Sequence, residues 1–132
     1  IPIFITRIIS FKIPAHILHI PNPNNVGQAL SIGKIIMNNP GNEYWDIFGF
    51  DIYDQGYDPS WYNYILPIVG NKPMAIGECS KLPGLDIIAS QPRWVFFMPW
   101  AELVKESNTT EEIIKVYEDP KVITRDEMPG WK

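Results

Sequence analysis

Apolar residues occur along this chain mainly in short runs that end at proline, glycine or asparagine. Runs of roughly four to eight apolar residues with such boundaries are typical of strands buried on both faces, as in a parallel sheet. The sequence therefore predicts strands over 16–20, 44–53, 74–80 and 93–100.

The segments between these runs predict helices and loops. Helices are expected over 1–15, 26–37, 62–69 and 85–90, with a loop over 54–61 and an extended tail over 122–124. A further helix begins with the capping-box pair Thr109 and Glu112, and Asp119-Pro120 stops it. Strands that alternate with helices or loops predict a parallel α/β sheet with crossover connections.

Polar or aromatic residues stand where three of the predicted strands end. They are Asp51 and Tyr53, then Glu78, and then Trp100. The carboxyl ends of parallel strands meet along one edge of the sheet, which is where catalytic groups of α/β proteins gather. The sequence thus predicts an edge with two acids, a phenol and an indole, an inventory that suits sugar hydrolysis.

Each of these residues also has a plain structural interpretation. Glu78 follows Gly77 at the end of an apolar run, where a carboxylate either does chemistry or pairs with a nearby Lys or Arg. Asp51 and Tyr53 are two positions apart and point the same way along a strand, so they form either a site wall or a surface hydrogen-bonded pair. The sequence leaves both interpretations open.

The composition is rich in aromatic residues, at 13%, with five Trp and six Tyr. Rings with a polar group suit binding surfaces, and sugars are a natural partner because their C–H faces are apolar; packing in the core is the alternative role. The tryptophan of the 54–61 loop, Trp61, is one candidate for sugar binding. A net charge of −4 without a basic run argues against nucleic acid.

Other classes of site find little support. His16 and His19 are three apart and point to opposite faces of a strand, so they do not share a metal, and no cofactor is expected. Cys79 is the only cysteine, so no internal disulfide forms. No stretch is long enough for a membrane span, and the start at Ile1 has no signal-peptide pattern.

Four segments resemble glycoside hydrolase family 26, the β-mannanase family, in its order. Residues 46–53 resemble its sixth strand, 72–78 its seventh strand, 94–100 its eighth strand, and 108–124 its closing helix and tail. The likeness extends over about 16–131. The chain is therefore similar to the C-terminal half, about strands five to eight, of a (β/α)₈ TIM barrel, as one partial catalytic domain over 1–132 with a poorly matching leader over 1–15.

The resemblance implies a retaining endo-β-1,4-mannanase that needs no metal. It makes Glu78 the nucleophile, with Tyr53 donating a hydrogen bond that helps keep it ionised. Asp51 would contact the sugar, and Trp100 would lie beneath it. The substrate would be mannan, galactomannan or glucomannan, and the family predicts an extracellular or cell-surface location.

The family's acid/base Glu has no match. No Glu or Asp precedes Glu43, which lies in a turn at the wrong end of a strand, and Glu102 and Glu106 follow the last strand. A retaining enzyme needs a second carboxyl about 5 Å from the first. We therefore expect a fragment that lacks its general acid, and open barrel edges that favour self-association.

Three alternatives remain open at this stage. The chain is a non-catalytic carbohydrate-binding half-barrel, a family member acting on β-glucan or β-1,3-xylan, or a (β/α)₈ glycosidase of another clan in which Glu78 has the same role.

Overall fold

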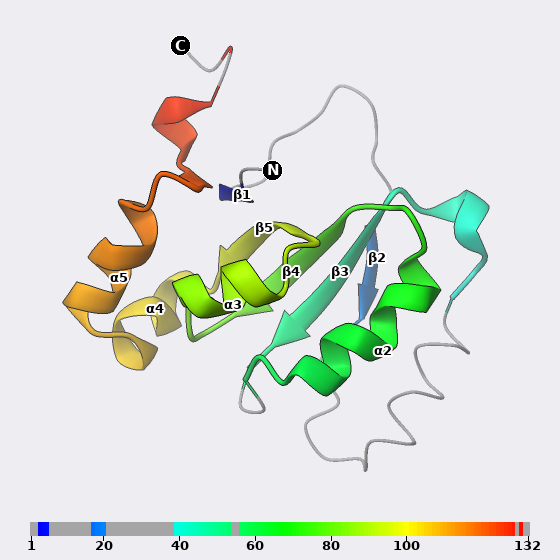
Figure 1. Cartoon of the computed structure of the whole chain (residues 1–132), viewed down its shortest axis with the longest axis horizontal. Helices are drawn as coiled ribbons and strands as arrows, with labels where there is room; N and C mark the ends of the chain where they lie inside the picture. Colours follow the sequence, from blue (N-terminus) through cyan, green and yellow to red (C-terminus); the bar gives the residue numbers. More distant parts are fainter. Residues whose placement is uncertain (1–2, 6–16, 21–38, 54–55, 129, 131–132) are drawn as a thin grey trace.

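Six parallel strands form one sheet in the computed structural model, which describes residues 3–5, 17–20, 39–53, 56–128 and 130. Their order across the sheet is β2-β3-β4-β5-β1-β6 (Figure 1). The strands are β1 (Ile3–Ile5), β2 (Ile17–Ile20), β3 (Ile47–Ile52), β4 (Met74–Cys79), β5 (Trp94–Pro99) and β6 (Val122–Ile123). The predicted parallel α/β sheet is confirmed, and each of the four predicted strands contains one of β2 to β5.

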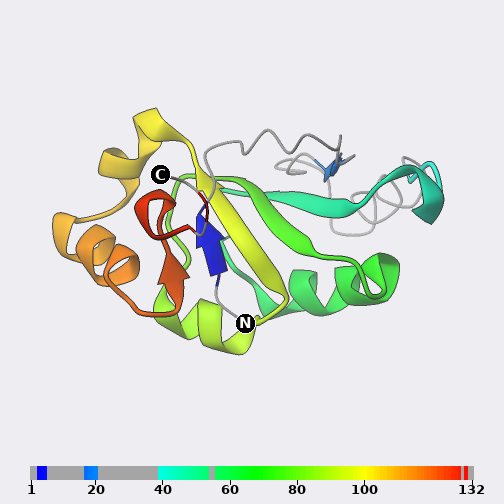
Figure 2. The ribbon, with the colours of Figure 1, turned by 90° about the horizontal axis from the view of Figure 1, so that it is seen from above.

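The helices of the described part are short. They are η1 (Asn42–Tyr44), α2 (Pro59–Val69), α3 (Leu85–Ser90), α4 (Ala101–Ser107), α5 (Thr110–Tyr117) and η2 (Arg125–Glu127). Figure 2 shows α2 and α3 along one side of the sheet, with β1 between β5 and β6. One face of the sheet is thus covered by helices, as crossover connections require.

The core lies between that covered face and α2. Phe48 and Phe50 of β3 are almost fully buried and their rings stack, with centroids 6.5 Å apart. Tyr62 of α2 packs against Trp94 of β5, with ring centroids 5.6 Å apart. Large apolar side chains of β3, β4 and β5 therefore point alternately toward the helices, which leaves the intervening positions for the opposite face.

Sequence signals explain where α2 begins and ends. Asp58 is its N-cap and accepts a 2.7 Å hydrogen bond from the Ser60 N–H, and Pro59 occupies the first turn. Gly70 ends the helix with a φ of 60°, which glycine adopts without strain. The prediction of a loop over 54–61 was therefore wrong from Pro59 onward, because Asp58-Pro59 is a helix start.

Two further expectations need correction. The helix predicted over 1–15 is wrong at Ile3–Ile5, which form strand β1 because they pair with both β5 and β6; 6–15 lie outside the described residues, as does the helix predicted over 26–37. The chain also forms α4 directly after Trp100, where no element was expected.

The remaining elements follow the sequence. Helix α3 spans 85–90 as predicted. The capping box at α5 is present in both directions, since Thr109 N–H donates to Glu112 Oε2 at 2.8 Å and Glu112 N–H donates to Thr109 Oγ1 at 3.2 Å. The tail that follows α5 forms β6.

Candidate active site

The end of β4 contains a bulge that decides where Glu78 points. Phe50 of β3 is in register with Ile76, but the next residue, Asp51, is in register with Glu78. Gly77 is therefore an extra residue in β4, and regular pairing resumes at Ile52 and Cys79. Without the bulge, strict alternation would put Glu78 on the same face as Ile76, toward the helices.

The bulge brings Glu78 to the face that carries Asp51 and Tyr53. Tyr53 Oη donates a 2.7 Å hydrogen bond to Glu78 Oε2. Asp51 is only 4% exposed, whereas Glu78 is half-buried. The two acids and the phenol predicted at one edge of the sheet are thus brought together, with the hydroxyl fixing the direction of the Glu78 carboxylate.

Tyr53 is suited to remain a donor. Burial, the hydrogen bond to Glu78 and the nearby charge of Glu78 all raise the pKa of its hydroxyl well above the usual value. The negative charge of Asp51 acts in the same direction. The phenol therefore stays protonated across neutral and mildly alkaline pH.

Trp100 lies beside the end of β4. Its backbone N–H donates to the Cys79 carbonyl at 2.8 Å, and its side chain is 47% exposed. A large, half-exposed ring one residue away from the Glu78 strand end is a surface on which the apolar face of a sugar can lie. The structure thus brings Trp100 to the same edge as Glu78.

Trp61 is not brought into this group. It lies in the first turn of α2, and its ring packs against Phe50 with centroids 6.0 Å apart. Phe50 points to the helix-covered face, whereas Asp51 points to the other. Trp61 therefore contributes to the packing of α2 on the sheet.

The turn that follows β4 has contacts that the sequence did not single out. We call residues 79–82, the last residue of β4 and the three that follow it, the post-β4 turn. Asn108, at the C-cap of α4, donates from Nδ2 to the Ser80 carbonyl at 2.8 Å and accepts at Oδ1 from the Leu82 N–H at 2.9 Å. Tyr57 Oη donates to the Lys81 carbonyl at 2.7 Å. An Asn just before a capping box signals a helix end in the sequence. Its hydrogen bonds to Ser80 and Leu82 become apparent only from the structure.

Cys79 points away from the candidate site. It is fully buried on the helix-covered face, and burial raises the pKa of its thiol from 9.0 to about 12. A thiol that stays protonated is a poor nucleophile. Cys79 is therefore not a candidate nucleophile at the end of β4.

Three further acidic residues of the described ranges lie outside the strands. Glu43 is in η1, which precedes β3 and so lies at the opposite end of the strands. Glu102 and Glu106 are exposed on α4. Within the described ranges, no group of three His, Cys, Asp or Glu side chains is arranged to hold a metal ion. The same part of the chain has no helix long and apolar enough to cross a membrane.

Comparison with known proteins gives a consistent result. Residues 6–127 match the family model described as glycosyl hydrolase family 26. A mannan endo-1,4-β-mannosidase of Thermothelomyces thermophilus is 32% identical over 100 residues, which cover 70% of this chain and 21% of that protein.

Solved structures resemble the fold as well. GH26A from a Muricauda species has a TM-score of 0.73 and 27% identity, covering 86% of this chain and 37% of that one. A β-mannanase from a symbiotic protist of the termite Reticulitermes speratus, complexed with gluco-manno-oligosaccharide, has a TM-score of 0.68 and 30% identity, covering 89% and 36%. The chain thus spans about a fifth of the curated relative and little more than a third of these two structures.

Proposed function

The chain belongs to glycosyl hydrolase family 26, and we propose that it carries the nucleophile side of a retaining glycosidase site for β-1,4-mannosidic bonds. One observation carries the proposal: the 2.7 Å hydrogen bond from Tyr53 Oη to Glu78 Oε2 at the carboxyl edge of the sheet. The names of the relatives, a mannan endo-1,4-β-mannosidase and a β-mannanase, support a mannan-type substrate.

In the proposed reaction, a Glu78 oxygen attacks the anomeric carbon of the sugar. The bond from that carbon to the leaving oxygen breaks, and a general acid protonates that oxygen. Water then hydrolyses the glycosyl ester, which restores Glu78 and retains the configuration. Tyr53 holds the carboxylate in line, Trp100 lies beneath the sugar, and Asp51 contacts it at the same edge.

The general acid is proposed to come from outside these residues, with the chain forming the C-terminal half of a (β/α)₈ barrel. Two facts support this. The chain spans 21% of its curated relative, and Glu43 precedes β3, at the opposite end of the strands from Glu78. The family's extracellular or cell-surface location is part of the same proposal.

The test uses a probe that needs no acid. An activated fluoro-sugar, 2,4-dinitrophenyl 2-deoxy-2-fluoro-β-mannobioside, has so good a leaving group that attack by the nucleophile releases dinitrophenolate without protonation. We expect the intact mass to increase by one fluoro-mannobiosyl group, with the label on the peptide that contains Glu78. The variant Glu78→Gln is expected to remain unlabelled, and labelling elsewhere would overturn the assignment.

Hydrolysis of a natural substrate, which does need a general acid, is the companion measurement. General acid catalysis contributes roughly 10²- to 10⁴-fold, so we expect very little reducing sugar from mannan compared with a complete family member. Comparing fluoro-mannobioside with the corresponding gluco and xylo probes distinguishes mannan from β-glucan or β-1,3-xylan as the substrate class.

A carbohydrate-binding half-barrel is the second candidate, and the 47% exposure of Trp100 favours it. Quenching of tryptophan fluorescence by mannohexaose, together with no labelling of Glu78 by the probe, would support binding over catalysis. Replacement of Trp100 by Ala is expected to abolish that quenching.

A further inference from the structure

Three consecutive carbonyls after Glu78 are each bonded by a different element. The Cys79 carbonyl accepts from the Trp100 backbone N–H at 2.8 Å. The Ser80 carbonyl accepts from Asn108 Nδ2 at 2.8 Å, and the Lys81 carbonyl accepts from Tyr57 Oη at 2.7 Å. The post-β4 turn is therefore fixed from the end of β5, from the end of α4 and from the segment before α2.

Asn108 has the larger share of these contacts. Its side chain is 7% exposed, and it accepts from the Leu82 N–H while donating to the carbonyls of Ser80 and Val104. Two donated hydrogen bonds and one accepted bond from the same side chain are the pattern of an amide group. A buried residue that bonds the turn on either side of Lys81 fixes its backbone as a neighbouring strand would.

The strand itself does not supply this restraint. Regular pairing with β3 is interrupted at Gly77, and the register with β5 also shifts between Ile76 and Cys79. Glu78 follows the bulge directly, so the direction of its carboxylate depends on what holds the next residues. Its hydrogen bond to Tyr53 is 2.7 Å long. A backbone displacement of about 1 Å would move the two oxygens beyond hydrogen-bonding distance.

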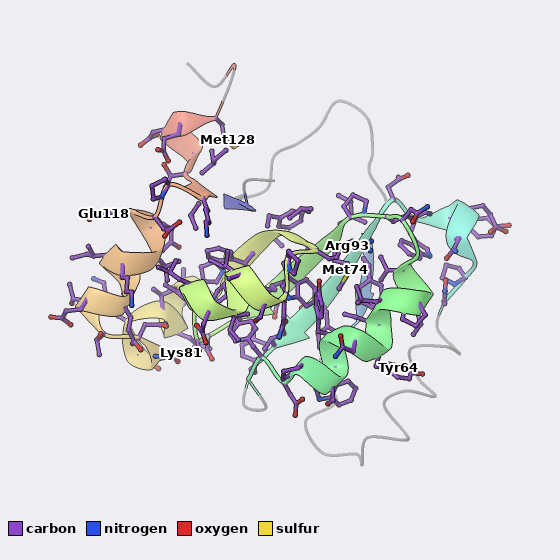
Figure 3. All side chains as sticks on the ribbon, viewed as in Figure 1. Tyr64, Met74, Lys81, Arg93, Glu118 and Met128 are labelled. Carbon is purple, nitrogen blue, oxygen red and sulfur yellow. The ribbon has the colours of Figure 1, made fainter. Side chains whose placement is uncertain are left out.

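The exposed contact on the same turn offers a control. Lys81 Nζ lies 2.6 Å from Glu112 Oε1, and both side chains are nearly half exposed. Exposed ion pairs restrain little because solvent screens them. Figure 3 shows Lys81 on the outside of the fold, near α4 and α5.

We propose that Asn108 and the Tyr57 hydroxyl are positioning residues that fix the post-β4 turn and so hold the Glu78 carboxylate against Tyr53. The expected effect of these residues on catalysis rests on the function proposed above. Their effect on the Tyr53–Glu78 hydrogen bond can be measured without any substrate.

The first measurement needs no substrate. With ¹³Cζ-tyrosine in the whole chain, the Tyr53 signal is assigned from the spectrum of Tyr53→Phe. Between pH 9 and 10.5, where an ordinary tyrosine begins to ionise, Tyr53 is expected not to titrate in the parent chain. In Asn108→Leu the Tyr53 signal is expected to titrate at lower pH than in the parent, because the hydrogen bond to Glu78 is lost, and in Lys81→Met to remain as in the parent.

The second measurement is the rate of labelling by the fluoro-mannobioside probe. We expect the first-order rate constant to fall about ten- to a hundredfold in Asn108→Leu, less in Tyr57→Phe, and not in Lys81→Met. Circular dichroism under the labelling conditions gives the folded fraction of each variant, and the rate constant is compared after division by that fraction. Asn108→Asp keeps the side-chain volume but not the donor, and replaces Asn108→Leu if the latter does not fold.

The outcomes separate the two proposals. An unchanged Tyr53 titration in the Asn108 and Tyr57 variants overturns the positioning role. A shifted titration together with an unlabelled parent chain supports positioning but overturns the proposed chemistry in this chain. A shifted titration with slower labelling supports both.

Discussion

The two ends of the sheet use their polar groups differently. At the amino end of the strands, Lys72 Nζ donates to the carbonyls of Asn42 and Trp45 and lies 4.2 Å from the centroid of the Trp45 ring. Arg93 Nη2 donates to the carbonyls of Gly70 and Lys72 at 2.8 and 2.9 Å. The cations there are bonded to backbone, which ties loops together.

At the carboxyl end, the half-buried Glu78 carboxylate accepts its hydrogen bond from a side chain, the Tyr53 hydroxyl. Figure 3 shows Met74 and Arg93 at one end of the strands and Lys81 at the other. The hydrogen bonds of Lys72 and Arg93 go to backbone carbonyls and stabilise the fold. The Glu78 carboxylate is held by Tyr53 and is still partly exposed, so it can also contact a ligand. The difference explains why sheets of this kind use one edge for stability and the other for chemistry.

The largest expected effect is alkaline destabilisation from the carboxyl end. Because the pKa of Cys79 is raised from 9.0 to about 12 in the folded chain, its contribution is complete below pH 9 and is lost as pH rises toward 12. The loss amounts to about 4 kcal/mol by pH 12, of which about 2 kcal/mol has occurred by pH 10.5. Urea unfolding at pH 8 and 10.5 measures it, and Cys79→Ala is expected to flatten the dependence. An equal slope in that variant would assign the effect to other groups.

The amino end is tested by Arg93→Ala. Two hydrogen bonds from a charged donor are lost, so we expect the free energy of unfolding to fall by about 3 kcal/mol. Arg125→Ala, which removes an exposed 3.9 Å ion pair with Asp126, is the control and is expected to change little. In the folded fraction of Arg93→Ala, the probe is expected to label Glu78 at the parent rate. A slower rate would mean that the two ends are coupled.

Tyr53→Phe gives the opposite pattern. It removes the hydroxyl that fixes Glu78, so the labelling rate is expected to fall about tenfold. The free energy of unfolding is expected to change by less than about 1 kcal/mol, since the bond lies at a solvent-accessible edge. A large loss of stability with an unchanged rate would make Tyr53 a structural residue like Arg93.

The smallest effect belongs to neither end. Thr109→Ala removes the capping oxygen of α5 and is expected to cost about 1 kcal/mol of stability. Thermal and urea unfolding measure it, with Thr110→Ala as the neighbouring control. Because the capping oxygen of Thr109 bonds within α5 itself and not to the post-β4 turn, labelling of Glu78 is expected to be unchanged.

Local sequence signals determined much of this protein. Short apolar runs bounded by Pro, Gly and Asn specified the parallel strands, and the Thr109–Glu112 pair specified the start of α5, because these signals act within a few residues. The same local information places Asp51, Tyr53, Glu78 and Trp100 at strand ends.

Only the tertiary structure decided which face Glu78 occupies and which residues hold it there. Alternation along β4 would turn Glu78 toward the helices, and the bulge at Gly77 reverses this because β3 and β5 fix the register on either side. Trp61 packs against Phe50 because α2 begins at Pro59, earlier than the helix predicted over 62–69. Asn108 reaches the post-β4 turn across 28 positions, a contact that depends on how α4 folds back and that no local pattern encodes.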